Sequence, residues 1–383
     1  LCMEVLHFYL KRTQILKAIN RILLSSFMSE KTSDLNNKKY NCRACNSNDI
    51  KEFKFKHFTF KTKNYDWKSF ICFKCGAVSE FNLQNKKTDY IGGGYRKNET
   101  LLNSDLLEKK VLPPINSWSI ITFARWKKIY EILKLNTNLF SDKFKMLDYG
   151  GYNGFLPFAL NQKQKIDSTV ADFDEAGLKM ASHLGSTAIN LKNENIKDND
   201  FKLITLVHVL EHLEEPKKIF QKLTSHLSKG GYIYIEVPNL YSFPLGDKSH
   251  LISYTHYSLA NFFLDSKIKI IDFGFTQTPH ESIKFEYYYN NKEENLYILG
   301  KKSDETSNLK IPTALIPKNI NSFKYKIQLS YAKIMLFYIS KNLFKLFLRY
   351  LRTFLLFLIY GLIEVITLKL FKRSFLNKFK KNN

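Results

Sequence analysis

Three glycines follow an acidic residue in the stretch MLDYGGYNGF, residues 146–155. An apolar run that ends in an acid and a glycine turn predicts a strand, a tight turn and a helix, which can hold a ligand against the backbone. The pattern Gly-x-Gly-x-x-Gly of dinucleotide sites is not met, because Tyr152 and Phe155 stand at its second and third glycines when it is started at Gly150. A phosphate loop is excluded as well, since GFLPF follows where Gly-Lys-Ser/Thr is needed.

These residues fit a ligand that carries an ammonium, a carboxylate and a ribose. Asp148 can attract the ammonium, and N–H groups at the start of the next helix favour the carboxylate. Asp172 ends the following apolar segment and can accept both hydroxyls of a ribose. S-adenosylmethionine has all three groups, and the residues expected to bind it are Asp148, Gly150, Gly151, Asn153, Gly154, Asp172, Val207 and His208.

Two more segments extend this pattern: FKLITLVHVLEHLEEPKKIF at 201–220 and LSKGGYIYIEVPN at 227–239. With them the sequence resembles the class I S-adenosylmethionine-dependent methyltransferases, in the order and spacing that the family shows. The resemblance implies an α/β fold with a Rossmann-like, doubly wound, seven-stranded sheet, and in-line methyl transfer. Tyr152 stands where the family usually has glycine, and Lys202 where it usually has an acid.

The sequence places seven strands and several helices in alternation, which is typical of an open, mostly parallel sheet. The expected strands are 144–149, 168–171, 186–190, 201–207, 232–237, 267–273 and 296–300. A helix is expected from Ser119 before the first strand, another from Asp174 to His183, and a third from Pro216 to Leu227, stopped by Lys-Gly-Gly at 229–231.

Four of the five cysteines form two C-x-x-C pairs, Cys42 with Cys45 and Cys72 with Cys75. Each pair can present two thiolates to one ion, and four thiolates complete a closed, structural zinc site. A redox dithiol pair or chance spacing is the alternative. The pairs also suit a reducing compartment such as the cytoplasm.

A cysteine-rich unit before such a domain resembles the zinc-containing C-methyltransferases that act on nucleotide-linked keto-sugars, and related enzymes of surface-polysaccharide clusters. The segment SHLISYTHYSLANFF at 249–263 is similar to a histidine-containing stretch of those proteins. His250, His256 and His208 are candidate bases, since imidazole accepts protons near neutral pH, and Tyr254 is a candidate hydrogen-bond donor. Glu211 and His212 are interpreted as structural.

The formal charge of +24 suggests a polyanion or an anionic membrane as a partner. Residues 119–302 hold 23 basic and 21 acidic side chains, whereas residues 309–383 hold 15 basic residues and one acid, Glu364. Basic residues from Lys326 to Arg352 share one side of a helical wheel, so we expect an amphipathic tail on an anionic membrane surface; a packed helical extension is the alternative.

The expected organisation has five parts: a leader at 1–39, a zinc-ribbon unit at 40–90, a linker at 91–118, the methyltransferase domain at 119–302 and a basic, amphipathic helical tail at 303–383. The leader is either an amphipathic helix or lies upstream of the true start at Met28. The expected function is methylation of a sugar, nucleotide-linked or lipid-linked, on the cytoplasmic face of the membrane. The near-neutral central domain argues against a nucleic-acid acceptor, and an inactive membrane-bound scaffold is the non-enzymatic alternative.

Overall fold

The computed structural model describes residues 40–53, 68–81, 117–241, 250–264, 266–276 and 294–304, together with Leu351, Arg352 and Leu355. The expected leader and most of the expected linker and tail lie outside these ranges. The chain divides into two units, Leu1–Ile327 and Gln328–Asn383, and every feature below belongs to the first. Among the described residues, no helix combines the length and apolar character needed to cross a membrane.

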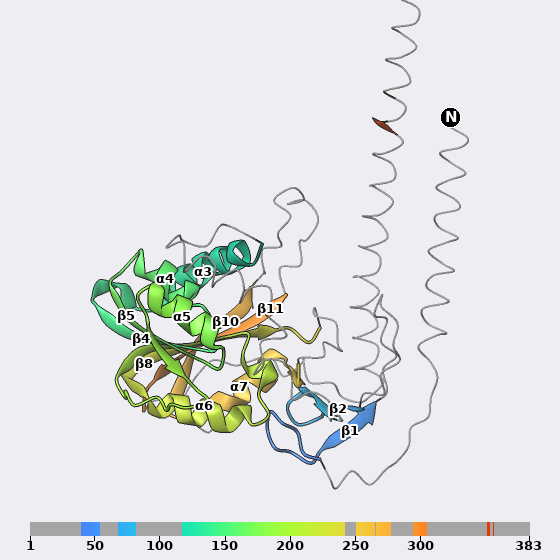
Figure 1. Cartoon of the computed structure of the whole chain (residues 1–383). Coiled ribbons are helices and arrows are strands. Elements are labelled where there is room, and N and C mark those ends of the chain that lie inside the picture. Colours follow the sequence, from blue (N-terminus) through green and yellow to red (C-terminus); the bar gives the residue numbers. More distant parts are fainter. Residues whose placement is uncertain are drawn as a thin grey trace, which may run out of the picture. The chain divides into compact units, whose positions relative to one another are not determined.

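A seven-stranded sheet forms the centre of the first unit (Figure 1). Its strand order is β10-β11-β8-β7-β4-β5-β6, and β11 runs antiparallel to both of its neighbours. The expected α/β fold with a mostly parallel sheet is therefore confirmed. The strands are β4 (Phe144–Tyr149), β5 (Ile166–Asp172), β6 (Thr187–Asn190), β7 (Phe201–Val207), β8 (Leu227–Pro238), β10 (Ile268–Thr276) and β11 (Asn295–Lys302).

Helices cover both faces of this sheet (Figure 1). One face carries α3 (Ser117–Asn136), α4 (Phe155–Asn161) and α5 (Glu175–His183), and the other carries α6 (Pro216–Ser225) and α7 (His256–Leu264). Short 3-10 turns, η1 (Leu139–Ser141) and η2 (Leu210–His212), follow α3 and β7. The side chain of Asp174 caps α5 by accepting from the Gly177 N–H at 2.8 Å.

One part of the helix prediction is wrong. Helix α6 ends at Ser225, and the Lys-Gly-Gly expected to stop it lies inside β8. Gly230 has a φ of +71°, and the pairing of β8 with β7 shifts its register between Phe201 and Leu203. The glycines therefore allow the irregular pairing at the start of β8. Glycine suits such irregular positions as well as it suits the end of a helix.

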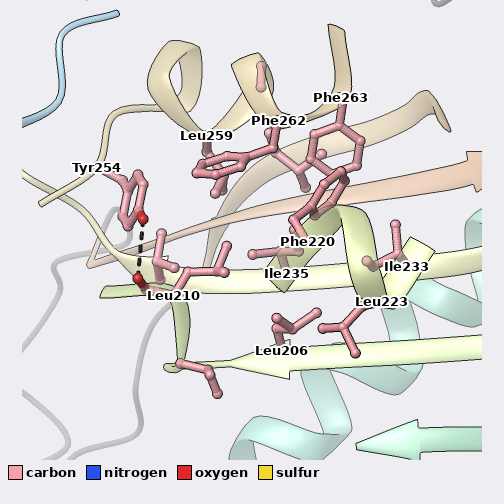
Figure 2. Close-up of a cluster of buried hydrophobic side chains, with 14 of the residues drawn as sticks. Leu206, Leu210, Phe220, Leu223, Ile233, Ile235, Tyr254, Leu259, Phe262 and Phe263 are labelled. Carbon is pink, nitrogen blue, oxygen red and sulfur yellow. Dashed lines mark hydrogen bonds between the residues drawn. The ribbon is translucent and has the colours of Figure 1, made fainter. Parts of the chain in front are cut away.

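The sheet face that α6 and α7 cover contains the larger part of the core. The ring of Phe220 on α6 contacts the rings of Phe262 and Phe263 on α7, at centroid distances of 5.8 and 5.0 Å (Figure 2). They pack on the strand residues Leu206 and Ile235, which are fully buried. Because the sheet is covered on both faces, its central strands are apolar almost throughout.

A second, four-stranded sheet is built from the cysteine-containing segment. Its order is β1 (Ile50–Phe53), β2 (Lys68–Cys72), β3 (Val78–Phe81) and β9 (Ile252–Ser253), and the last strand comes from the α/β domain. Five buried residues of the segment belong to the same core cluster as residues of η2, β8 and α7: Cys42, Ala44, Cys72, Cys75 and Ala77. The cysteine end of the small sheet therefore shares its core with the α/β domain, while the rings of Tyr40, Phe70 and Phe81 contact one another within the small sheet.

Truncating the core should cost far more stability than truncating the surface. Leu223 on α6 is 1% exposed and Leu135 on α3 is 84% exposed. We expect Leu223→Ala to lower the free energy of unfolding by about 2–5 kcal/mol, because it leaves a cavity. The matched Leu135→Ala should change it by about 0.5 kcal/mol or less. Urea unfolding followed by circular dichroism measures both, and equal losses would contradict this packing.

Candidate active site

The glycine turn closes over the carboxyl end of β4. The N–H of Gly150, whose φ is +72°, donates to the Ala171 carbonyl on β5 at 2.7 Å. A side chain on Gly151 would overlap the carboxylate of Asp148. Gly154, with a φ of +71°, ends the turn and begins α4. Glycine is thus required for the backbone to reach this close to Asp148.

Asp148 is a buried carboxyl group that forms no ion pair with the residues that the structure describes. Its side chain is 3% exposed, and its Oδ1 accepts from the Thr205 hydroxyl on β7 at 2.6 Å. Burial raises the pKa of Asp148 to about 7; the Thr205 hydrogen bond opposes the shift and Asp172 adds to it. A cationic group placed here would favour the ionised carboxylate.

Asp172, at the end of β5, is held by backbone donors. Its Oδ1 accepts from the N–H groups of Phe173 and Asp174 at 2.6 and 2.9 Å, and its Oδ2 accepts from Tyr152 at 2.9 Å. Oδ1 thus uses both of its lone pairs, whereas Oδ2 keeps one with which to accept from a ligand hydroxyl. The bulky Tyr152 has a φ of +49°, and its ring packs where a side chain on Gly177 of α5 would otherwise stand.

His208 follows Val207 directly after β7, with a φ of +56°. Its Nδ1 lies 3.4 Å from Glu211 Oε1, and its Nε2 lies 3.6 Å from Glu236 Oε1. Burial and the positive charge of Arg125 lower the pKa of His208, but the two carboxylates outweigh them and raise it. The imidazole is therefore fixed between two acids at the same sheet edge as Asp148.

Glu236, on β8, is fully buried at the centre of the domain. Arg125 Nε of α3 lies 3.3 Å from its Oε1, and the Tyr234 hydroxyl donates to its Oε2 at 2.7 Å. Burial raises the pKa of Glu236, yet the contacts with His208, Arg125 and Tyr234 lower it overall. Sequence reasoning did not select Arg125 or Glu236; the signal was an acid within the apolar run YIYIEVP.

Glu211 and His212, on η2, lie beside His250. Glu211 Oε1 is 3.7 Å from His212 Nε2, and the rings of His212 and His250 are 4.9 Å apart between centroids. Burial raises the pKa of Glu211, but His212, His208 and His250 together lower it to about 2. Of the histidines expected as bases, the structure thus brings His208 and His250 to the same carboxylate. The signal in the sequence was HVLEH, which places His208, Glu211 and His212 within one loop.

The other two candidate catalytic residues lie in different surroundings. His256 begins α7, where its Nε2 is 2.6 Å from the Gly274 carbonyl and its ring contacts Phe273 and Phe275. Burial lowers the pKa of His256. Tyr254 is fully buried, and its hydroxyl donates to the Leu210 carbonyl at 3.2 Å (Figure 2). Both side chains hold the segment after β8 in place.

The four cysteines of the two C-x-x-C pairs come together. Cys42 Sγ lies 3.6 Å from Cys75 Sγ, and Cys45 Sγ lies 3.6 Å from Cys72 Sγ. All four sulfurs lie within 4.8 Å of one another. Thiolate sulfurs that each lie about 2.3 Å from a tetrahedral ion would be separated from one another by nearly the same distance as these two sulfur pairs, so the geometry fits one zinc ion.

This cysteine unit contacts the loop that carries Glu211. Backbone pairing of β3 with β9 is extended by the Glu80 N–H, which donates to the Leu251 carbonyl at 2.9 Å. The Leu251 N–H donates in turn to the Glu211 carbonyl at 2.7 Å, and Arg43 Nη1 lies 3.4 Å from the Glu214 carbonyl. The cysteine unit therefore helps to place His250 next to Glu211.

Replacing Asp148 by Asn should change how stability depends on pH. Because the pKa of Asp148 is raised from 3.8 to about 7, the folded chain binds one more proton than the unfolded chain between these values. Its stabilising contribution is full below about pH 4 and is lost as the pH rises through about 7, by at most roughly 1.4 kcal/mol per pH unit. Urea unfolding from pH 4 to 8 should therefore show the wild type losing stability relative to Asp148→Asn. Parallel curves would mean that this carboxyl titrates normally.

Three solved structures with a similar arrangement are distant from this chain. An S-adenosylmethionine-dependent methyltransferase from Clostridium acetobutylicum has a TM-score of 0.37 and 16% identity, over 55% of this chain and 99% of its own. An S-adenosylmethionine-dependent methyltransferase from Mesorhizobium loti has a TM-score of 0.37 and 14% identity, over 45% of this chain and 96% of its own. Magnesium protoporphyrin IX methyltransferase from Synechocystis PCC 6803, with bound SAH, has a TM-score of 0.38 and 16% identity, over 48% of this chain and 84% of its own. Likenesses this distant say nothing about substrate.

No curated protein matches the sequence. A family model described as a methyltransferase domain matches residues 122–274, which is less than half of the chain but includes the glycine turn, Asp172, His208 and His250. The α/β domain is thus that of a methyltransferase, the class of enzyme expected from the sequence.

Proposed function

We propose that the domain binds S-adenosylmethionine at the carboxyl edge of β4, β5 and β7 and transfers its methyl group to a sugar. The observation that carries the proposal is the buried carboxyl of Asp148, which lies against Gly151 and has a raised pKa. An ammonium group beside it would offset the cost of burying the carboxylate. The remaining lone pair of Asp172 Oδ2 would accept from a ribose hydroxyl.

S-adenosylmethionine supplies a methyl group on a sulfonium, so the chain's own residues have to align the acceptor and remove a proton. His208, in its neutral form, is the candidate proton acceptor, because it follows β7 and its ring is oriented by Glu211 and Glu236. Tyr254 is a positioning residue in this proposal, since its hydroxyl already donates to the Leu210 carbonyl.

The sugar acceptor rests on the resemblance of the segment 249–263 and of the cysteine unit to keto-sugar C-methyltransferases. In support, that segment begins at the candidate site, with His250 beside His212. Incubation with methyl-labelled S-adenosylmethionine, with soluble extract and membranes kept apart, would test it. Label in a nucleotide-sugar or in a lipid-linked glycan supports the proposal, whereas label only in nucleic acid or protein contradicts it.

The affinity for S-adenosylmethionine should rise with pH. Since the ionised form of Asp148 is the one that attracts an ammonium, binding should strengthen by up to about tenfold per pH unit between pH 5 and 7. Asp148→Asn should bind weakly and with no such slope, because amide and carboxyl differ in charge but hardly in size. Isothermal titration calorimetry at several pH values measures both. Equal affinities for the two proteins at pH 7 would refute this role of Asp148.

We also propose that the four cysteines hold one structural zinc ion. With four thiolates no coordination position is left for water, so the ion would stabilise the fold and take no part in methyl transfer.

Cys75→Ser should lose most of the zinc and loosen the contact with the α/β domain. Relative to the wild type, the variant should contain about one zinc ion fewer per molecule, measured by atomic emission, because a hydroxyl replaces a buried thiolate ligand. Hydrogen exchange at the amides of Glu80 and Leu251 should become faster, since the first bond joins β3 to Leu251 and the second is formed by the same Leu251 peptide backbone. Cys2→Ser is the matched control and should keep its zinc. A zinc-free wild type with slow exchange at both amides would rule out this structural role.

A further inference from the structure

Glu211 is a buried acid whose hydrogen-bonding capacity is not met by the described residues. Its side chain is 1% exposed, and neither Oε1 nor Oε2 has a hydrogen-bond partner among them. A buried carboxylate without such partners is costly. The nearest groups are imidazoles, with His208 Nδ1 at 3.4 Å and His212 Nε2 at 3.7 Å from Oε1. These distances are too long for strong hydrogen bonds but leave room for an ion between the groups.

The spacing of Glu211, His212 and His250 is that of ligands around a metal. One ligand atom from each of the three lies within 4.8 Å of the other two. Nitrogen and oxygen ligands lie about 2.0–2.2 Å from a first-row cation, so two ligands of one ion are separated by roughly 3–4 Å. Small side-chain rotations would therefore bring all three atoms to a common centre.

The backbone fixes these residues relative to each other. Glu211 and His212 share η2, and the Leu251 N–H, one residue after His250, donates to the Glu211 carbonyl at 2.7 Å. Tyr254 adds a second link through its bond to the Leu210 carbonyl (Figure 2). The cluster thus joins two segments at a place that the packing determines, which is what a metal site needs.

We propose that Glu211, His212 and His250 bind one divalent first-row metal ion, separate from the ion of the four cysteines. Two imidazoles and one carboxylate are a ligand set that suits iron, cobalt or zinc and leaves coordination positions open. His208 would then orient Glu211 without binding the metal itself. Carboxylates that bind a metal usually have such a hydrogen-bonding partner. This assignment makes His250 a ligand in place of a base.

The site also narrows the acceptor, a step that rests on the proposed function. Open positions on a cation accept oxygen atoms, so the acceptor would be a sugar hydroxyl with a second oxygen nearby, in place of the carbon atom that the keto-sugar C-methyltransferases methylate. The hydroxyl proton would pass to His208, the oxygen lone pair would form the bond to the methyl carbon, and the electrons of the carbon–sulfur bond would remain on sulfur. The products are a methyl ether and a neutral thioether, with no redox change.

The test is a titration of the full-length, zinc-loaded chain with Co²⁺. We expect about one Co²⁺ per chain, with weak visible bands, no thiolate charge-transfer band, and zinc retained by atomic emission. Glu211→Gln keeps the shape of the side chain but removes its charge, and should weaken binding by more than the roughly 10–100-fold that loss of an outer partner costs. His250→Ala, at a half-buried position, should do the same.

His183→Ala removes an exposed histidine on α5 and should bind Co²⁺ like the wild type. Absence of Co²⁺ binding, binding only with thiolate bands and loss of zinc, or equal binding by Glu211→Gln would each overturn the site. S-adenosylmethionine binding is measured on the same samples. Cofactor binding without Co²⁺ binding would refute the metal site alone, and Co²⁺ binding without cofactor binding would refute the proposed function alone.

Discussion

The backbone of Leu251 joins three segments that are far apart in the sequence. Its N–H donates to the Glu211 carbonyl at 2.7 Å, and its carbonyl accepts from the Glu80 N–H at 2.9 Å. The loop after β7, the cysteine unit and the segment before β9 therefore meet at one residue. Since buried backbone groups have to be paired, none of the three can move without the others losing a hydrogen bond. The positions of His250 and Tyr254 follow from this arrangement.

The buried charges along this edge are costly for folding. Arg125, Glu236, His208 and Glu211 follow one another at 3.3 to 3.6 Å, and both acids are almost fully buried. Ion pairs of this kind gain little over apolar residues of the same size, because desolvation offsets their attraction. Stability alone does not explain such a chain of charges. Its effect is to hold the His208 ring in one orientation beside the carboxyl ends of β4 and β7.

The sequence predicted the sheet well and the charged groups only in part. Strands at 144–149 and 201–207 were predicted with the limits that the structure shows, because strands buried on both faces are apolar runs. The limits of α6 were not, since Lys-Gly-Gly can stop a helix or begin an irregular strand, and only the pairing with β7 decides. Arg125 could not be linked to Glu236 either, because their contact depends on how α3 crosses the sheet.

Tyr152 shows how a departure from the family pattern can leave a turn intact. A non-glycine residue in the left-handed region costs roughly 1–2 kcal/mol, and Tyr152 adopts it with a φ of +49°. Its N–H still donates to Asp172, and its ring occupies the space that the missing side chain of Gly177 leaves on α5. The Tyr152 ring thus packs against α5 at Gly177, and the backbone at Gly151 still lies close to the Asp148 carboxylate. A turn disrupted by the substitution would lack the Tyr152–Asp172 hydrogen bond or the contact between Gly151 and Asp148, and this turn has both.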